Sequence, residues 1–314
     1  IFGSDEESGM SDLPVYLSSR KAPDFTFTPD GTYPVCNGEK GSCRGAFFFH
    51  PGSKSRIAAF SPGTAFNIVP ASACMQYKGI ISYTKLPEFI SVSTENGMTV
   101  IKAKGTPAHA STPEKGVSAA GRLCRFVLDN AELCDEDRRF LEFELDLALS
   151  YDGSAFGIDC KDSVFTPLTI IGGTAQTQKG TVGQSFDCRY PPCADGEQIV
   201  QKLKTAADNA GLSMSDSLID PPFYISPENN GIKSLLCTYE RVTGNKARTF
   251  VMGGGTYARH LPDAVSFGIE DPSMVFPEWA GRMHESNEAF PEQALMDDLV
   301  LMICAVNDLM DTDI

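Results

Sequence analysis

Residues 229–268 read NNGIKSLLCTYERVTGNKARTFVMGGGTYARHLPDAVSFG, and the order of elements in this stretch decides the fold of the C-terminal part of the chain. The pattern predicts a helix over residues 229–242. Residues 247–252 and 264–268 are typical of strands, and the three consecutive glycines between them predict a tight turn. A long helix is expected over residues 291–310. This order of helix, strand, turn, strand and helix predicts an α/β sheet.

Upstream of this stretch, Pro221 and Pro222 break the pattern and predict a domain boundary. The part before them mixes short strands with amphipathic helices. Strands are expected at residues 44–50, 56–60, 89–93, 98–103 and 184–190. Helices are expected at residues 117–130, 135–149 and 195–210, with Asp135 as the N-cap of the second and Gly211 ending the third.

The first 41 residues carry weaker signals. Residues 1–3 are interpreted as the end of a strand, residues 8–19 as a short helix weakened by Pro14, and residues 20–41 as a Pro- and Gly-punctuated loop. The chain begins without a Met, and we interpret this start as truncation or processing upstream.

Composition bounds the class of protein. The 314 residues are 42% hydrophobic and 21% charged, as in globular proteins, and the net charge of −15 disfavours nucleic acid as a partner because an acidic surface repels phosphates. We find no apolar run of the roughly 18 residues that a membrane helix needs and no signal peptide, so we expect a cytoplasmic protein without a membrane partner. Because the ten cysteines form no C-x-x-C pair, we expect buried free thiols and no tetrathiolate zinc site.

Candidate catalytic carboxylates lie in the acidic turn GSDEESG, residues 3–9. In a turn, Glu7 could bind a metal while its neighbour Glu6 takes a proton from metal-bound water. A solvated acidic turn before a helix is the alternative, and the triplet alone favours it. Asp30, between Pro29 and Gly31, is by default a turn residue.

Four further motifs could bind substrate or metal. His109 lies in a Gly/Pro loop and could polarise a substrate oxygen, or be an ordinary loop residue. Arg189 could clamp a carboxylate with its planar fork, or form a surface ion pair. The glycine turn with Gly254 and Gly255 could present N–H groups to an anion. His284, in HESNE, could be a metal ligand or a titrating surface histidine.

Each signal is weak alone, but their order along the chain is specific. The chain closely resembles the PepV-type dipeptidases, which belong to the di-zinc peptidase family that includes carnosinases, aminoacylases and desuccinylases. Seven motifs match in order over nearly the whole chain: GSDEESG (3–9), TPDGTYPV (28–35), NGEKG (37–41), GTPAHAS (105–111), CRYP (188–191), GGGTYAR (253–259) and HESNE (284–288).

The resemblance implies an α/β fold with two parts. A catalytic domain with an α/β/α sheet would comprise residues 1–39 and 226–314, and an inserted α+β lid domain would comprise residues 40–225. The enlarged lid is typical of relatives that act as monomers, so a monomer is expected.

The resemblance also implies the site. Glu6 would be the general base; Glu7 and His284 would bind one zinc and Asp30 the other. From the lid, His109 would stabilise the oxyanion, while Asn67 and Arg189 would hold the substrate, with Gly254 and Gly255 at its carboxylate end. The metals would be two Zn ions, with Mn or Co as alternatives that the sequence does not separate.

This sequence departs from the family in one respect. The family's first metal-binding His and its bridging Asp precede the Glu-Glu pair, and neither motif is present in these 314 residues. We therefore predict dipeptide hydrolysis for a full-length parent and an inactive, metal-poor polypeptide for the truncated chain. An N-acyl amino-acid deacylase of the same family and a non-catalytic association module are the alternatives.

Overall fold

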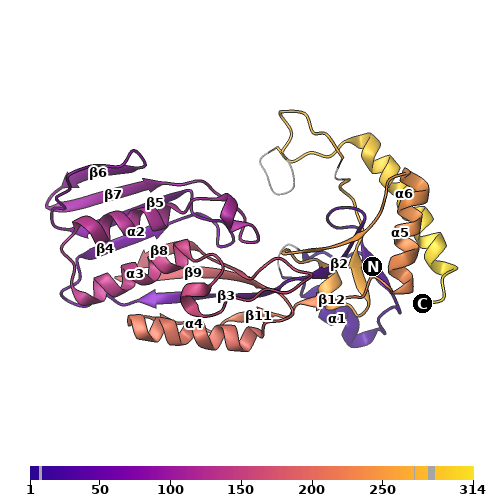
Figure 1. Ribbon diagram of the computed structural model, residues 1–314, viewed down its shortest axis with the longest axis horizontal. Helices are drawn as coiled ribbons and strands as arrows, with labels where there is room; N and C mark the ends of the chain where they lie inside the picture. Colours follow the sequence, from indigo (N-terminus) through magenta and orange to yellow (C-terminus); the bar gives the residue numbers. More distant parts are fainter. Residues whose placement is uncertain (7–8, 272, 282–286) are drawn as a thin grey trace. The chain divides into compact units, whose positions relative to one another are not determined.

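The computed structural model describes residues 1–6, 9–271, 273–281 and 287–314. The chain divides into two compact units: unit 1 comprises Ile1–Lys40 and Pro222–Ile314, and unit 2 comprises Gly41–Pro221. Each unit has its own sheets, helices and hydrophobic core (Figure 1). The predicted mixed α/β class is confirmed.

Unit 1 is built on a sheet with the strand order β1-β14-β2-β12, to which β13 adds by pairing with β2. The strand β1 is parallel to β14, β13 is parallel to β2, and β14 is antiparallel to β2. These strands are β1 (Thr26–Thr28), β2 (Val35–Glu39), β12 (Phe223–Tyr224), β13 (Thr249–Met252) and β14 (Ala264–Ser266).

The expectation of a loop through residues 20–41 is wrong, because this segment contains β1 and β2. All five residues of β2 are buried. Pro34 and Gly38 have low β-propensity and obscured the strand signal. The burial of Val35 and Cys36 in the unit 1 sheet outweighs this low propensity.

The helices of unit 1 are α1 (Asp12–Ser19), α5 (Asn230–Thr243) and α6 (Glu292–Met310). The side chain of Asn229 caps α5 by accepting the N–H groups of residues 231 and 232. Helices α5 and α6 lie side by side (Figure 1) and contribute Leu235 and Leu301 to a core that also holds Val265. The opposite face of α6 leaves several apolar side chains exposed.

Unit 2 contains two antiparallel sheets. One has the order β10-β3-β9-β8, with β11 also paired to β3, and the other has the order β4-β5-β7-β6. Their strands are β3 (Gly41–Phe49), β4 (Ile57–Pro62), β5 (Ser72–Lys78), β6 (Ile90–Glu95), β7 (Met98–Lys104), β8 (Thr169–Gln178), β9 (Thr181–Tyr190), β10 (Ser213–Met214) and β11 (Leu218–Asp220).

Three helices cover these sheets (Figure 1): α2 (Ala119–Asn130), α3 (Asp135–Leu149) and α4 (Gly196–Ala210). Asp195 caps α4 by accepting the N–H groups of residues 197 and 198, and Gly211 ends it in the left-handed region. The helices α2 and α3 pack on each other and bury Leu123 and Phe140 in the core.

Three details differ from the predictions for unit 2. The strands β5, β8, β10 and β11 were not predicted. The N-cap of α3 is Cys134, and Asp135 is the first helical residue. Cys160 and Cys193 are joined in a disulfide. The other eight cysteines form no disulfide, but only four of them are buried, and the expectation of buried thiols is wrong for the exposed Cys237.

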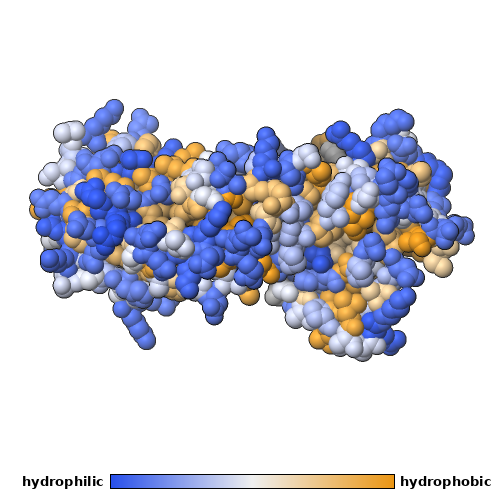
Figure 2. Space-filling view, turned by 60° about the horizontal axis from the view of Figure 1, so that its bottom comes forward, coloured by the Kyte–Doolittle hydropathy of each residue, from blue (hydrophilic) through white to orange (hydrophobic). Residues whose placement is uncertain are grey.

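Hydrophilic side chains predominate on the face shown in Figure 2, with apolar patches between them. Among the described residues, no helix combines the length and the apolarity that crossing a membrane requires.

Candidate active site

In unit 1, the acidic loop is held by the hydroxyl group of Tyr257; the structure describes residues 3–6 and 9–11 of this loop. The hydroxyl accepts the N–H of Asp5 at 3.2 Å and donates to the carboxylate of Asp12 at 2.8 Å. The same Asp12 oxygen accepts the N–H of Ser4 at 2.8 Å. Two backbone groups of the loop are therefore fixed by one tyrosine and one aspartate.

The loop is further closed by its own residues. The carboxylate of Asp5 accepts the N–H of Ser11 at 2.8 Å and also its hydroxyl group. Glu6, the predicted base, follows directly and is partly buried. Glu7, a predicted metal ligand, lies outside the described residues.

A buried ion pair lies next to the glycine turn of residues 253–255. The guanidinium of Arg259 donates from Nε to the carboxylate of Glu39 at 3.1 Å, and the side chains are 7% and 0% exposed. The other Glu39 oxygen accepts the N–H of Thr256 at 3.0 Å and its hydroxyl at 2.7 Å. Arg259 also donates to the carbonyl of Gly254 at 3.2 Å. The conformation of the turn that carries Gly254 and Gly255 is thus tied to β2.

The electrostatics follow from these contacts. Burial raises the pKa of Glu39, although Arg259 and Thr256 act in the opposite direction. The hydrogen bonds from Ser4 and then Tyr257 lower the pKa of Asp12. Burial, followed by the hydrogen bond to Asp12, raises the pKa of Tyr257. The Asp12 carboxylate is therefore the charged member of its pair.

Asp30 follows the carboxyl end of β1, which pairs in parallel with β14. The hydroxyl of Ser266 donates to the Asp30 carbonyl, and backbone hydrogen bonds join residues 31 and 33 to Glu270 at 2.9 Å each. Asp30 is partly buried. The carboxyl ends of parallel strands are where open α/β sheets place ligands. His284, the other predicted metal ligand, lies outside the described residues.

In unit 2, Asn67 and His109 lie on two paired backbone segments. Ile68 and His109 form an antiparallel bridge, and the N–H of Ala110 donates to the carbonyl of Asn67 at 2.9 Å. His109 is exposed and Asn67 is partly buried. The structure therefore brings these two predicted residues together.

The hydrogen bonding of His109 indicates its tautomer. Its Nδ1 accepts the backbone N–H of Ser111 at 3.2 Å and lies 2.8 Å from the Ser111 hydroxyl. Because a backbone amide can only donate, the neutral ring carries its proton on Nε2. An Nε2–H group is the kind of donor that stabilising an oxyanion requires.

Arg189 lies near the end of β9, where it forms a buried ion pair rather than the surface pair considered above. Its Nε and Nη2 donate to the two oxygens of Asp187 at 2.6 and 2.9 Å, and Asp187 is fully buried. In the β8–β9 register, Arg189 is opposite Thr169, whose hydroxyl donates to the carbonyl of Ala110 at 2.8 Å. Arg189 is thus linked through Thr169 to the His109 loop.

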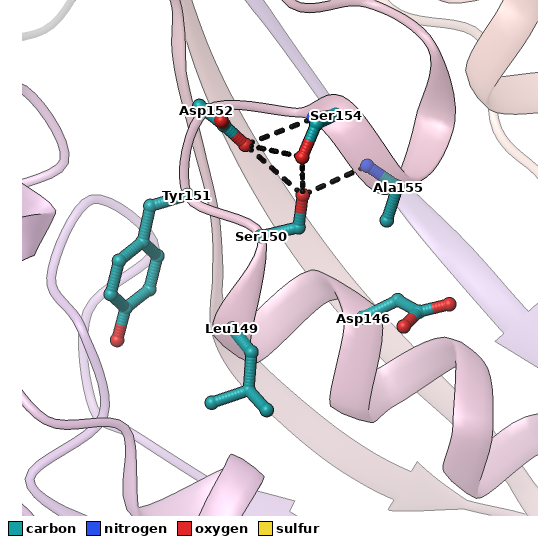
Figure 3. A pocket seen from close by; sticks show the side chains of 7 residues that line it. All are labelled: Asp146, Leu149, Ser150, Tyr151, Asp152, Ser154 and Ala155. Carbon is teal, nitrogen blue, oxygen red and sulfur yellow. Dashed lines mark hydrogen bonds between the residues drawn. The ribbon is translucent and has the colours of Figure 1, made fainter.

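A hollow in unit 2 is open to solvent (Figure 3). Its polar lining is a local turn in which Asp152 accepts hydrogen bonds from the N–H (3.0 Å) and the hydroxyl (2.7 Å) of Ser154, and from the Ser150 hydroxyl (3.2 Å). The turn satisfies these groups locally, so the hollow does not resemble a catalytic site. Tyr151 points away from this network (Figure 3) and packs against the cluster that holds Val69 and Ala110.

Metal-ligating groups cluster at one place in the described residues, Cys134, Glu136 and Asp137 at the start of α3. Asp137 is buried, but it accepts the hydroxyl of Ser55 at 2.5 Å and the N–H of Arg56 at 2.8 Å, so both of its carboxylate oxygens already accept a hydrogen bond. The predicted ligands Glu7, Asp30 and His284 supply carboxylate oxygens and an imidazole nitrogen, a donor set that suits zinc.

The sequence analysis missed Glu39, Tyr257 and Asp12. Glu39 and Tyr257 lie inside the matched motifs NGEKG and GGGTYAR, so the signal was present. Their partners are more than 200 residues away in the chain, and spacing alone gives no sign of such contacts.

Comparison with known proteins gives consistent results. Residues 96–214 match the family model of the peptidase dimerisation domain, M20_dimer. The chain is 29% identical over 331 residues to a putative dipeptidase YtjP of Bacillus subtilis, covering 98% of this chain and 68% of that protein. It is 26% identical over 322 residues to a Beta-Ala-Xaa dipeptidase of Lactobacillus delbrueckii subsp. lactis, with coverages of 96% and 65%. The chain therefore spans about two thirds of the length of these relatives.

Among solved structures, the aminoacylhistidine dipeptidase from Vibrio alginolyticus matches with a TM-score of 0.51 and 15% identity, over 98% of this chain and 69% of that one. This match concerns the fold alone. The structural match confirms the predicted fold class, and the similarity to two dipeptidases confirms the prediction of an enzyme, a hydrolase.

Proposed function

We propose that the protein is a metal-dependent dipeptidase of the PepV type that hydrolyses the peptide bond of dipeptides with a free carboxylate. The observation that carries the proposal is the similarity to two dipeptidases over 96–98% of the chain. The order of the seven sequence motifs supports the same assignment.

We assign the metal ligands from the resemblance. Glu7 and His284 would hold one zinc ion, and Asp30 would hold the other. Bound zinc supplies Lewis acidity, which polarises a carbonyl and lowers the pKa of water. Carboxylate and imidazole ligands favour zinc or a similar divalent ion over magnesium.

The remaining chemistry belongs to the side chains. Glu6 would accept the proton of the attacking water and pass it to the leaving amine. The Nε2–H of His109 would donate to the oxyanion of the tetrahedral intermediate. Its tautomer, indicated by the Ser111 N–H at Nδ1, supports this role because no proton has to move before the hydrogen bond forms.

Substrate-binding residues are also assigned from the resemblance. In unit 2, Asn67 would hydrogen-bond the substrate, and Arg189 would bind its terminal carboxylate. The ion pair with Asp187 orients the guanidinium for this task. In unit 1, the N–H groups of Gly254 and Gly255 would contact the carboxylate end of a substrate.

The ligand count leads to a second expectation. In this assignment, residues 1–314 give two protein ligands to one metal and one to the other, whereas catalytic zinc usually has three. We therefore expect the polypeptide of residues 1–314 by itself to hold zinc weakly and to hydrolyse dipeptides poorly.

The oligomeric state is a separate proposal. We propose a monomer in which unit 2 serves as the lid. The similarity of residues 96–214 to a peptidase dimerisation domain favours the alternative that unit 2 associates with another copy. Light scattering at several protein concentrations separates the two, because a dimer would lose mass on dilution.

The test of the function starts with metal. Zinc per chain is measured by elemental analysis after incubation and desalting, and by titration with a chromogenic competitor, for the unmodified chain, His284→Ala and His50→Ala. His50 is the matched control, since its ring nitrogens contact Thr181 and Ser213 in unit 2. We expect weakened zinc binding in His284→Ala alone. Equal zinc affinity in all three proteins would refute the ligand assignment.

The reaction is then assayed with β-Ala-His, Leu-Leu and N-acetyl amino acids as substrates, with and without a chelator. We expect the protein that carries the complete ligand set to cleave the dipeptides, and the chelator to abolish cleavage. Preferential release of acetate from N-acetyl amino acids would instead identify a deacylase.

A further inference from the structure

Tyr257 joins two parts of unit 1 that are far apart in the sequence. It belongs to the GGGTYAR motif, whereas the groups at its hydroxyl belong to the acidic loop and to the start of α1. The contacts comprise the Asp5 N–H and the Asp12 carboxylate. One hydroxyl therefore uses both its acceptor and its donor capacity on the segment that surrounds Glu6.

The packing around Tyr257 is equally specific. A Cβ at Gly3 would collide with the ring and the hydroxyl of Tyr257. A larger residue at position 3 would therefore have to displace the end of the Tyr257 side chain. The first glycine of GSDEESG thus leaves room for a side chain from a distant part of the sequence.

The turn that carries Tyr257 is itself held in place by the residues on either side of Tyr257. The hydroxyl of its neighbour Thr256 accepts the N–H of Ala258 at 3.2 Å and donates to Glu39. Arg259, two residues after Tyr257, forms the buried ion pair with the same Glu39 carboxylate. Because these contacts fix the turn, the Tyr257 side chain can hold the less buried acidic loop in one position.

We propose that Tyr257 is a positioning residue that holds the acidic loop in the conformation required by Glu6 and by the adjoining metal ligand. This inference rests on the proposed function for the roles of Glu6 and Glu7. It goes beyond that function by assigning the conformation of the loop to a hydroxyl group outside it.

The first test is amide hydrogen exchange of residues 1–12 in the 314-residue chain, followed by mass spectrometry. Tyr257→Phe keeps the ring against Gly3 and removes only the hydroxyl. Tyr16→Phe is the matched control: this tyrosine lies in α1, and the structure gives its hydroxyl no hydrogen bond to a described residue. We expect exchange in residues 1–12 to become at least about tenfold faster in Tyr257→Phe, because the hydroxyl loses both its hydrogen bond to the charged Asp12 carboxylate and the one from the Asp5 N–H.

Variants of Asp12 test the same contact from the other side. Asp12→Asn keeps a carbonyl oxygen that can accept both hydrogen bonds but removes its charge, so its exchange rate should lie between those of the unmodified chain and Asp12→Leu. Asp12→Leu removes both bonds and should exchange at least as fast as Tyr257→Phe. The effects of Asp12→Leu and Tyr257→Phe should be less than additive, because the two substitutions remove the same Tyr257–Asp12 hydrogen bond and Tyr257→Phe further removes only the bond to the Asp5 N–H.

The second test is binding of cobalt(II), whose visible absorption reports its coordination. Tyr257→Phe should shift the cobalt titration midpoint severalfold upward, Tyr16→Phe should leave it unchanged, and Asp30→Asn tests the proposed metal site itself. Faster exchange with an unchanged cobalt midpoint in Tyr257→Phe, while Asp30→Asn weakens cobalt binding, would overturn the positioning role and leave the proposed function standing.

Two other outcomes also decide the matter. Unchanged exchange in Tyr257→Phe would overturn the inference whatever the metal does. An unchanged cobalt midpoint in both Tyr257→Phe and Asp30→Asn would refute the proposed metal site, and the positioning role would fall with it.

Discussion

Replacing Arg259 by Met would leave the buried carboxylate of Glu39 without its counter-charge. Glu39 is 0% exposed and Arg259 is 7% exposed, so solvent does not take over from the lost guanidinium. Methionine keeps an apolar stem of similar length, and the two hydrogen bonds from Thr256 remain. Removal of one partner of a buried pair costs about 3–5 kcal/mol.

This cost converts to a rate that can be measured. At 1.36 kcal/mol for each factor of ten, the opening equilibrium of unit 1 should rise by roughly two to four orders of magnitude. Cys36, in β2, is buried in unit 1, and Cys124, in α2, is buried in unit 2. When reclosing is faster than modification, the labelling rate of a buried thiol follows the opening equilibrium. In Arg259→Met, Cys36 should be labelled roughly two to four orders of magnitude faster, and Cys124 should be unaffected.

The pH dependence gives a second readout. Burial already raises the pKa of Glu39 in the folded chain. For a carboxyl group whose folded pKa is raised, the stabilising contribution is complete below the unfolded value and is lost as pH rises through the folded value. Arg259→Met removes a positive charge that lowers the pKa of Glu39. In the variant, the stabilising contribution is therefore lost over a range that reaches higher pH. The difference in hydrogen exchange of the β2 amides between the variant and the unmodified chain should therefore shrink as pH falls.

Lys233→Met is the matched control in the same unit. It breaks the ion pair with Glu228, whose side chains are 50% and 81% exposed, and an exposed pair contributes at most about 1 kcal/mol. If Cys36 reacts no faster in Arg259→Met than in Lys233→Met, the reasoning about the buried pair is wrong.

Three further predictions concern unit 2. Burial raises the pKa of Glu144 in α3 to about 8 from 4.5, so the stability of unit 2 should fall as pH rises between these two values and level off above them. Glu144→Gln should flatten this dependence of stability on pH, as measured by urea midpoints from pH 5 to 8.5. Asp195→Ala removes the cap of α4 and should lower the free energy of unfolding by about 1 kcal/mol, whereas Asp208→Ala on the exposed face of the same helix should not. In a protein that hydrolyses dipeptides, His109→Ala should lower kcat by about 10²–10³ with little change in KM, with His50→Ala as the control; a change confined to KM would contradict an oxyanion role.

Elements whose signals were local could be predicted from the sequence. Gly211 ends the helix α4 as predicted, and Asp195, predicted as the first residue of this helix, is its N-cap. The strand β5 alternates buried Ala73, Met75 and Tyr77 with more exposed residues, so its period-2 signal was present but was not recognised. In β8, Gly172 and Gly173 interrupt the pattern where the register with β9 shifts, so propensity alone gave no strand there.

The candidate site could be predicted only in part, for a different reason. The motifs name residues, but the function of a side chain depends on partners that chain order does not reveal. Arg189 was expected either to clamp a substrate or to pair at the surface, and the buried Asp187 beside it was not considered. The Glu39–Arg259 pair spans 220 positions, so neither residue carries a signal until the fold is known.

The insertion of unit 2 explains why such distant contacts arise within unit 1. The chain leaves unit 1 after Lys40 and returns at Pro222. On the unit 1 side, Phe223 in β12 is paired with Glu39 in β2; on the unit 2 side, Asp220 in β11 is paired with Ser42 in β3. Because the outgoing and returning segments are antiparallel neighbours on each side, each unit satisfies the backbone hydrogen bonds at its own end of the connection.

This topology leads to a physical expectation about cooperativity. The described core clusters of the two units share no residue, and the connecting strands are paired within each unit. A substitution in the core of one unit should then open that unit without opening the other. The comparison of Cys36 with Cys124 tests this expectation as well, since equal acceleration of both thiols in Arg259→Met would mean that the two cores unfold as one.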